Sequence, residues 1–466
     1  MNTATALIYL LAAILFIIGL QFLSSPARAR RGNWVAALGM ALALGWTLAL
    51  LWGTFTPAGV TASVAGVAIG AVAGTLGART VKMTAVPQMV ALFNGVGGGA
   101  AALIALAELL KQNPDHTAAL TTLPSAFAVM VGGVSFAGSM VAFAKLQGLI
   151  TGTPITYPGQ PVVNALLTLA WIGVLVVLVA VNGSAAVLAV LLLLALAVGV
   201  GMVLPIGGAN MPVVISLLNA FTGLAVAATG FVLDNFALIV AGTLVGASGT
   251  LLTKLMSDAM GRPLTGVLFG AFRPGQSATS EGGASGGAER PTRVGSADDI
   301  GTMLAYAQRV IIVPGYGLAV AQGQHAVREL ADVLEQRGVE VTYAIHPVAG
   351  RMPGHMNVLL AEANVPYEQL KEMDEVNDQF KLADVVLVVG ANDVVNPAAR
   401  SSPGSPIYGM PILNADQARA VVFLKRSTRP GFSGTDNDLL YDPRTIILFG
   451  DARDSLTKLI AAVKAA

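Results

Sequence analysis

The chain has 466 residues, of which 55% are hydrophobic and only 11% are charged, whereas soluble globular domains carry about 25% charged residues. It has no cysteine, which excludes disulfides, thiolate metal sites and cysteine nucleophiles. Residues 1–272 carry a net charge of +5 and residues 273–466 a net charge of −4. No basic block stands out in the second part, so no nucleic-acid partner is expected.

The first part reads as a membrane domain. A helix needs about 20 apolar residues to cross a bilayer, and nine runs approach this length: 4–23, 34–53, 57–77, 86–109, 123–143, 162–181, 186–205, 213–233 and 236–256. We therefore expect a polytopic all-α membrane domain over residues 1–272, surrounded by membrane lipid. An alternative for the first run is a signal peptide, because Ala27-Arg28-Ala29 weakly resembles a cleavage site, but no positive charge precedes it.

Basic residues indicate the orientation of the spans. They follow the odd-numbered runs, as Arg28, Arg30, Arg31, Arg79, Lys82, Lys145, Lys254 and Arg262. The other connections carry Glu108, Lys111, Asp115, His116 and Asp234. The positive-inside rule then predicts an external N-terminus and a cytoplasmic C-terminal domain.

Few polar residues lie inside the runs. No Asp, Glu, Lys, Arg or His occupies the middle of one, and the polar candidates are Asn94, Ser139, Asn164 and Asn219. A buried Asn often makes only an interhelical hydrogen bond; the alternative is that some of these residues line a water path for protons. Glycines recur at four-residue spacing, at 66, 70 and 74 and at 242 and 246, which indicates close helix packing.

Residues 273–292 are rich in Gly and Ser and predict a flexible linker. The domain that follows, 293–466, alternates apolar strands with helical patterns. The strands are expected at 309–313, 340–345, 384–389, 420–424 and 445–449, and the helices near 318–337, 357–364, 368–380 and 451–465. This order predicts an α/β Rossmann-like domain with a parallel sheet and helices on both faces.

A glycine-rich turn follows the first of these strands. Gly315-Tyr316-Gly317 leads into a helix, as in dinucleotide-binding turns, where the first glycine permits the tight turn and the second lets a pyrophosphate approach the backbone. Val320 stands where such turns usually have Gly or Ala. The strand–turn–helix context favours a nucleotide site over a chance match.

Two features favour NADP(H) over NAD(H). The second strand ends in Ile345-His346-Pro347 without the acidic residue that usually binds the ribose 2′-hydroxyl. Lys425-Arg426-Ser427 follows a later strand and offers the charges that a 2′-phosphate needs. The alternative is that this is a solvated basic turn.

Two more loops are candidates for the site. The Gly350–His355 loop places Arg351 among Gly and Pro, which suits a pyrophosphate. The Gly390–Pro397 loop follows the third strand, and ligands of such sheets bind at the carboxyl ends of strands. Asp393 is therefore placed to meet the cofactor; the alternative is a helix N-cap. The histidines are too scattered to predict a metal site.

These motifs carry a resemblance to a known family. Gly315–Gln322, the GRMPGHMNVLLAEA run of Gly350–Ala363, Gly390–Ala399 and Lys425-Arg426-Ser427 resemble the beta subunit of the proton-translocating NAD(P) transhydrogenase. The resemblance covers the chain from the first span to the last helix, the linker excepted. It implies hydride transfer between NADH and NADP⁺, coupled to inward proton movement across a bacterial inner membrane.

The resemblance also implies partners and a binding pose. NADP(H) would bind this chain in an orientation reversed from the usual Rossmann pose. NAD(H) would bind a separate alpha subunit, which brings further membrane helices, and the working enzyme would be a dimer of such assemblies. The cofactor-binding residues expected from the loops and the resemblance are Gly315, Tyr316, Gly317, Ala319, Val320, Ala321, Gly350, Arg351, Met352, Pro353, Gly354, Gly390, Ala391, Asn392, Asp393, Val394, Lys425, Arg426, Ser427, Gly431, Phe432, Gly450, Asp451 and Ala452.

The resemblance assigns further roles. Asp393 would lie near the nicotinamide and the coupling machinery, and is the catalytic candidate. Gly431–Gly434 matches a lid over the nucleotide, with Phe432 where many members have Tyr. Asn94 stands where some members carry His, and the remaining expected proton-path residues are Ser139, Asn219 and Gly249.

Two other function classes remain open. A nucleotide-gated channel or transporter would use the soluble domain only as an NADP(H) sensor, but the apolar runs contain no potassium filter of the TVGYG kind. A membrane-anchored dehydrogenase would need its own substrate domain, which the sequence does not show. A neighbouring reading frame with a second dinucleotide-binding domain would favour the transhydrogenase.

Overall fold

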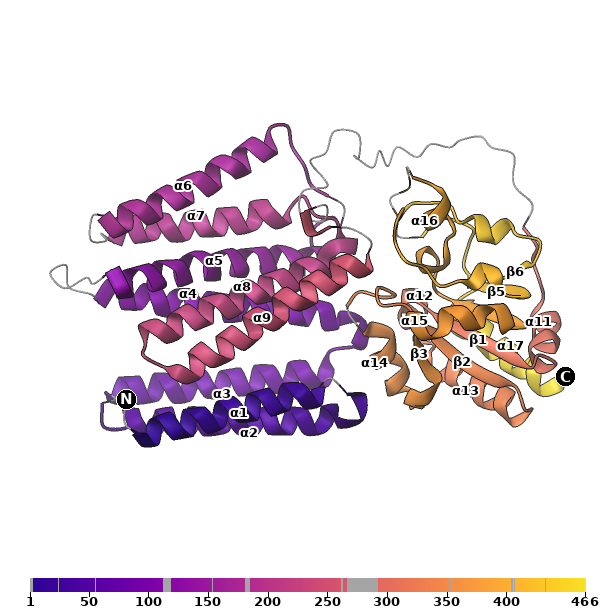
Figure 1. Cartoon of the computed structure of the whole chain (residues 1–466), viewed down its shortest axis with the longest axis horizontal. Helices are drawn as coiled ribbons and strands as arrows, with labels where there is room; N and C mark the ends of the chain where they lie inside the picture. Colours follow the sequence, from indigo (N-terminus) through magenta and orange to yellow (C-terminus); the bar gives the residue numbers. More distant parts are fainter. Residues whose placement is uncertain are drawn as a thin grey trace. The chain divides into compact units, whose positions relative to one another are not determined.

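The computed structural model describes residues 3–265 and 292–466, apart from residues 24, 55, 112–118, 153, 181–184, 261–262, 353, 404, 406 and 432. The chain divides into two compact units, Met1–Thr253 and Lys254–Ala466 (Figure 1). Each unit has a hydrophobic core of its own. The predicted linker lies outside the described residues except for Thr292. The division at 272 and 293 therefore stays a prediction.

The first unit is built from long apolar helices. Within the described residues nine of them are long and apolar enough to cross a membrane (Figure 1), which confirms the nine predicted runs. They are α1 (Thr3–Leu23), α2 (Pro26–Leu51), α3 (Pro57–Thr80), α4 (Val86–Lys111), α5 (Ala119–Gln147), α6 (Gln160–Ala180), α7 (Ala185–Val203), α8 (Met211–Val232) and α9 (Phe236–Ala259).

Helix α2 begins earlier than predicted. The apolar pattern placed its start near residue 34, but the helix begins at Pro26, in the first-turn position that suits proline. Arg28, Arg30 and Arg31 therefore lie on the helix, not in a connection. Arginine can extend its apolar stem along a membrane helix while its charge reaches the interface, so a basic first turn does not prevent the helix from forming.

Helices α4, α5 and α8 form the most buried part of this unit. The buried share of their candidate membrane spans is 39%, 67% and 61%, higher than for any other span in the described residues. Glycine allows this close packing. A Cβ on Gly132 of α5 would lie 2.6 Å from the carbonyl oxygen of Gly98 on α4, and a Cβ on Gly98 would lie 3.0 Å from Cβ of Ser135. The two backbones thus approach closely enough for short polar side chains to bridge them.

The spaced glycines behave in two ways. A Cβ on Gly242 of α9 would overlap the backbone of α8, as the packing interpretation predicts, whereas a Cβ on Gly246 would make only an ordinary contact, 3.5 Å from Cδ2 of Leu224. Gly66, Gly70 and Gly74 of α3 face open space, with no atom within 4 Å of an added Cβ. Helix α3 has no buried residue among those described.

The second unit is a six-stranded sheet in the order β3-β2-β1-β4-β5-β6, with every neighbouring pair parallel. This confirms the predicted Rossmann-like fold, whose order reverses between β1 and β4. The strands are β1 (Arg309–Pro314), β2 (Glu340–Ile345), β3 (Leu370–Glu372), β4 (Val385–Val389), β5 (Ala420–Lys425) and β6 (Thr445–Phe449).

The central strands form because their residues are β-branched and apolar. Ile311 of β1 pairs with Val386 of β4, and both side chains are fully buried. Continuous apolar runs of this kind are typical of parallel sheets covered on both faces. The helices of this unit are α11 (Ala297–Ala305), α12 (Tyr316–Val320), α13 (Gln324–Gln336), α14 (His355–Glu362), α15 (Met373–Val376), α16 (Ala398–Ser401) and α17 (Ala452–Ala465) (Figure 1). Of these, α16 packs in a separate apolar cluster with Ile407 and Ile412.

Two predicted helices are wrong in detail. The segment 318–337 forms two helices, because Gln322 adopts a left-handed conformation with φ of 52° between α12 and α13. The segment 368–380 contains the edge strand β3 and the short helix α15 in place of one helix. The sheet thus has six strands where five were predicted, since a three-residue strand shows no alternation that a sequence pattern could detect.

Candidate functional site

The glycine-rich turn packs against the turn that follows β4. A Cβ on Gly317 would lie 2.7 Å from Cα of Gly390, and a Cβ on Gly315 or Gly390 would overlap backbone of the opposing turn. The amide of Gly317 donates to the carbonyl of Gly390 at 2.9 Å. Gly390 also has φ of 68°, which favours glycine. Glycine is therefore required here by packing between two turns, whatever approaches them from outside.

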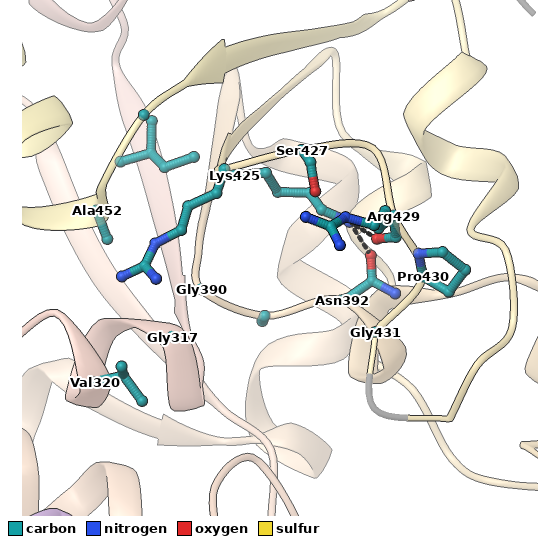
Figure 2. A pocket seen from close by; sticks show the side chains of 14 residues that line it. Gly317, Val320, Gly390, Asn392, Lys425, Ser427, Arg429, Pro430, Gly431 and Ala452 are labelled. Carbon is teal, nitrogen blue, oxygen red and sulfur yellow. Dashed lines mark hydrogen bonds between the residues drawn. The ribbon is translucent and has the colours of Figure 1, made fainter. Parts of the chain in front are cut away.

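A pocket lies at the carboxyl ends of β1, β4, β5 and β6. Its volume is about 300 Å³, and Figure 2 shows the side chains that line it. The lining residues are Gly317, Val320, Gly390, Ala391, Asn392, Leu424, Lys425, Arg426, Ser427, Arg429, Pro430, Gly431, Gly450 and Ala452. The pocket thus begins at the switch point of the sheet, where ligands of doubly wound folds bind.

Lys425 is the half-buried cation of the pocket. Its ammonium donates to Oδ1 of Asn392 at 2.7 Å and to the carbonyl of Arg429 at 3.2 Å (Figure 2). Burial lowers the pKa of Lys425, while the charges of Asp393 and Asp436 oppose this shift. The ammonium is therefore held in a fixed place with a neutral amide as one of its acceptors.

Arg426 lies on the same stretch but has a charged partner. Its guanidinium donates to Oδ2 of Asp451 at 2.7 Å. Asp451 also caps α17, because its Oδ1 accepts from the amide of Arg453 at 3.0 Å. Despite unfavourable burial, these hydrogen bonds lower the pKa of the Asp451 carboxyl, so Asp451 is ionised beside the exposed guanidinium of Arg426.

Asp393 holds the segment that follows the pocket lysine. Its Oδ2 accepts from the amide of Ser433 at 2.8 Å, and its Oδ1 accepts from the side chain of Asn392 at 3.0 Å. A Cβ on Gly431 would lie 2.5 Å from Oδ1 of Asp393. The side chain thus holds Ser433 and lies against Gly431, and it does not cap a helix. These two residues belong to the stretch 429–437 (the lid segment), which contains the predicted lid Gly431–Gly434. Phe432, the expected centre of the lid, lies outside the described residues.

The loop after β2 forms a second group beside the glycine-rich turn. The guanidinium carbon of Arg351 lies 4.4 Å from the ring centre of Tyr316. The amide of Arg351 donates to Nδ1 of His355 at 3.0 Å, and the rings of Tyr316 and His355 are 5.9 Å apart. The structure therefore brings the predicted Arg351 to the predicted Tyr316. Pro353 of this loop lies outside the described residues.

The pocket collects part of the predicted site. Eleven predicted residues line it: Gly317, Val320, Gly390, Ala391, Asn392, Lys425, Arg426, Ser427, Gly431, Gly450 and Ala452. Ala319 and Val394 are buried in the core of the sheet. The other described ones do not line the pocket: Gly315, Tyr316, Ala321, Gly350, Arg351, Met352, Gly354, Asp393 and Asp451.

Sequence reasoning missed three residues that line the pocket, Leu424, Arg429 and Pro430. Arg429 follows Lys425 by four residues on a loop, a spacing with no meaning outside a helix, so no pattern distinguishes it. The described residues contain no group of three His, Cys, Asp or Glu that could hold a metal ion.

The predicted proton-path residues come together only in part. The amide of Asn94 on α4 donates to Oγ of Ser139 on α5 at 2.9 Å. Ser135 on α5 and Thr222 on α8, which the sequence did not single out, extend this contact. Oγ of Ser135 accepts from the amide of Asn94 at 3.4 Å and lies 2.6 Å from Oγ1 of Thr222. All four side chains are buried. Their hydroxyl and amide groups form one connected set across three helices.

The other two predicted residues lie outside this set. Asn219 is half-buried on α8, one turn before Thr222. Gly249 of α9 accepts from Oγ of Ser216 at 3.2 Å, and a Cβ there would lie 2.8 Å from the amide nitrogen of Ala220. Gly249 therefore marks a close crossing of α8 and α9.

Comparisons with known proteins show the family of the chain. The family model described as NAD(P) transhydrogenase beta subunit matches residues 5–462. Two relatives named NAD(P) transhydrogenase subunit beta, one from Rhodospirillum rubrum and one from a particular strain of that species, are each 47% identical over 478 aligned residues. The alignment covers 99% of this chain and 99% of each relative. The chain therefore belongs to the NAD(P) transhydrogenase beta subunit family.

Proposed function

We propose that this chain is the NADP(H)-binding and proton-translocating subunit of a transhydrogenase, in which hydride transfer between NADH and NADP⁺ is coupled to inward proton movement. The observation that carries the proposal is the pocket at the β1–β4 switch point, in a chain of the beta-subunit family. Nine apolar helices precede the nucleotide-binding fold in the same chain, which supports a membrane-coupled reaction.

The charge of the pocket supports NADP(H) as the cofactor. Lys425 and Arg426 both line it, and charged donors of this kind bind a 2′-phosphate well. At the end of β2 stands His346, fully buried, in place of an acid for a 2′-hydroxyl. NADP(H) would bind with its 2′-phosphate near β5, far along the sheet from the usual site, which fits the reversed pose.

The residues of this chain would bind and orient the nucleotide. Lys425 and Arg426 would hold the 2′-phosphate, Arg351 the pyrophosphate, and the turn at Gly315–Gly317 the backbone side of the cofactor. The lid segment, fastened to Asp393, would cover it and keep water away. Bound NADP(H) supplies the hydride chemistry, and Asp393 would sense whether the lid is closed.

The second nucleotide would come from a partner. The described residues contain one dinucleotide-binding turn, and hydride transfer needs two nucleotides. The name subunit beta of the relatives supports an NAD(H)-binding alpha subunit, which we place beside this chain in a dimer of assemblies. We propose a bacterial inner membrane as the location, with the C-terminal unit in the cytoplasm.

The buried set Asn94, Ser135, Ser139 and Thr222 would carry the proton across α4, α5 and α8. None of these groups titrates near neutral pH, so they would pass a proton through water or to a titrating group of the partner. Asn219 would lie on the same path, and Gly249 would let α8 and α9 come close enough to enclose it.

The proposal is tested by reconstitution. The chain is placed with its alpha partner in sealed liposomes, and NADPH formation from NADH is followed with and without an imposed pH gradient. We expect NADPH to form faster and to a higher final level when protons are more concentrated outside. If hydride transfer ignores the gradient, an uncoupled membrane dehydrogenase replaces the proposal; if there is NADPH binding but no hydride transfer, a nucleotide sensor replaces it.

A further inference from the structure

The loop Gly350–Gly354 (the arginine loop) is closed by the first residue of α14. The amide of His355 donates to the carbonyl of Met352 at 3.2 Å, and the amide of Arg351 donates back to Nδ1 of His355 at 3.0 Å. Gly350 has φ of 133°, and a Cβ there would lie 2.7 Å from Cβ and Nδ1 of His355. The imidazole thus occupies the space that any other residue at position 350 would need.

These contacts fix the protonation state of the ring. Because Nδ1 accepts a hydrogen bond from an amide, it carries no proton, and the neutral ring must carry its proton on Nε2. Burial and the nearby charge of Arg351 both lower the pKa of His355, which favours the neutral form. The side chain is 1% exposed, and its Nε2 has no hydrogen-bond partner among the described residues.

The same ring touches the glycine-rich turn. It lies 5.9 Å from the ring of Tyr316, tilted by 56°, and Tyr316 in turn lies under the guanidinium of Arg351 at 4.4 Å. Arg351 is therefore held at both ends: its backbone by the imidazole and its charge by the tyrosine face, a cation–π contact. His355 is the one side chain that contacts both the arginine loop and Tyr316 in these interactions.

We propose that His355 is a positioning residue of the nucleotide site, whose Nδ1 holds the arginine loop so that the Arg351 guanidinium stays beside the glycine-rich turn, ready for the pyrophosphate of a dinucleotide. This inference rests on the proposed function, because it assumes that a dinucleotide binds at this turn. The inference adds His355 to the residues that shape the nucleotide site. Because His355 is neutral and buried, neither charge nor exposure would identify it as such a residue.

Simple packing does not account for this histidine. A buried donor without a partner destabilises a fold, and an apolar ring at position 355 would avoid that cost. His346, the other buried histidine of this unit, differs in this respect: Nε2 binds the carbonyl of Pro411 at 2.8 Å and Nδ1 accepts from the amide of Val348 at 3.2 Å. His346 is satisfied at both nitrogens and serves as the matched control.

Two variants distinguish the contribution of Nδ1 from that of Nε2 of His355. In His355→Asn the amide oxygen stands as many bonds from Cα as Nδ1 does, so it can still accept from Arg351. In His355→Gln the amide reaches the place of Nε2 and the Nδ1 acceptor is lost. With the full chain in detergent and NADPH fluorescence as readout, we expect Kd to change less than about threefold in His355→Asn and to rise about tenfold in His355→Gln.

A double-mutant cycle tests whether the effect passes through Arg351. In an Arg351→Ala background, His355→Gln should weaken NADPH binding no further, because the group that it positions is gone. His346→Asn should lower the thermal stability without changing Kd. In the assembled enzyme, His355→Gln should raise KM for NADP⁺ and leave KM for NADH unchanged.

Contrary outcomes are distinct. Equal Kd values in wild type, His355→Asn and His355→Gln would overturn the inference but leave the NADP(H) site standing. Equal losses in the Asn and Gln variants, or additive losses with Arg351→Ala, would also overturn it, since they show a packing role. A wild-type chain that does not bind NADPH would overturn the proposed function together with the inference.

Discussion

At the scale of single residues, Lys425 and Arg426 differ although they are neighbours. Lys425 has neutral acceptors, Asn392 and the carbonyl of Arg429, whereas Arg426 is already paired with the carboxylate of Asp451. A phosphate that binds between them competes with a full negative charge for Arg426 but only with neutral oxygens for Lys425. We therefore expect Lys425 to contribute more to phosphate binding.

We predict that the two alanine variants weaken NADPH binding to different extents. A hydrogen bond to a charged group contributes about 1.5–3 kcal/mol, so Lys425→Ala should weaken NADPH binding about tenfold or more, and Arg426→Ala should weaken it less. The control is Arg419→Ala, which removes the same charge beside Asp384. These two residues precede β5 and β4, at the amino ends of the strands, whereas the pocket lies at the carboxyl ends. Titration with NADPH and NADH measures all three, and equal affinity for both nucleotides in the wild type would contradict the phosphate role.

His346 gives a prediction for pH. Burial lowers its pKa from 6.5 to about 4, so the unfolded chain binds a proton more readily than the folded one. Its contribution to stability is complete above pH 6.5 and is lost as the pH falls toward 4, by about 1.4 kcal/mol per pH unit. His346→Phe should flatten the fall in unfolding temperature between pH 7 and 5. His325→Gln, at an exposed position, should leave this fall unchanged. An equal slope of unfolding temperature against pH in the wild type and both variants would contradict the role given to His346.

At this scale the sequence predicts residues whose role follows from their own chemistry. It does not predict residues whose role depends on a contact with a residue far away in the chain. Lys425-Arg426 and the Gly315–Gly317 turn could be identified because charge and glycine spacing have direct physical meaning. The contact of Asp393 with Ser433 joins residues that are 40 apart in the chain, and Thr222 joins Ser135 across 87 residues. Only the fold brings such pairs together.

At the scale of elements, Lys145 ties one membrane helix to the end of another. It lies in the last turn of α5 and is buried, and its ammonium donates to the carbonyls of Leu204 and Ile206, the latter at 2.7 Å. Leu204 and Ile206 lie in the segment that follows α7, and the carbonyl of Leu204 also accepts from the amide of Ile155 at 3.2 Å. The predicted loop lysine thus ties the end of α5 to the segment after α7.

Lys145→Met should therefore destabilise the helical unit. Methionine keeps most of the length but removes the ammonium donor from the carbonyl of Ile206, and the loss of a partner costs a buried group about 1–3 kcal/mol. Lys254→Met is the control, because Lys254 lies exposed near the end of α9. The unfolding temperature measured in detergent should fall for Lys145→Met alone. Equal stability of both variants would show that the contact of Lys145 with the segment after α7 is dispensable.

The lid segment gives the second prediction at this scale. Asp393→Ala removes the acceptor of the Ser433 amide, so amide hydrogen exchange over residues 429–437 should rise and NADPH should dissociate faster. Asp393→Asn keeps one oxygen acceptor and should change exchange less, while the lost charge should still impair coupling to proton movement. Exchange rates that are unchanged in Asp393→Ala would show that other contacts hold the lid.

Element boundaries were predictable where a long apolar pattern sets them, as for α4 and the central strand β4. They were not where a few residues decide. The edge strand β3 has three residues, α2 begins at a proline ahead of its apolar run, and a single left-handed residue, Gln322, separates α12 from α13. The sequence also could not show that Gly315, Gly317 and Gly390 pack against each other.

At the scale of the whole molecule, the number of helices limits how coupling can work. If all nine candidate spans of the described residues cross the membrane, the two chain ends lie on opposite sides, and a nucleotide site on one side could respond to protons from the other. One charge crossing 100 mV corresponds to about 2.3 kcal/mol, or roughly a fiftyfold shift in an equilibrium constant. A shift of this size suffices to drive NADPH formation, since NADH and NADPH carry hydride at nearly the same potential.

The orientation is the last prediction, and the absence of native cysteine makes it cleanly testable by labelling. Basic residues gather at the ends of α1, α3 and α5, so these ends should be cytoplasmic, as should Ala466. Lys82→Cys, between α3 and α4, and Ala466→Cys should resist a membrane-impermeant thiol reagent on intact cells. Leu233→Cys, in the turn between α8 and α9, should react, and all three should react after permeabilisation. Labelling of Leu233→Cys and Ala466→Cys from the same side would mean that α9 does not cross the membrane, and the two sides of the proposed coupling would then have to be reassigned.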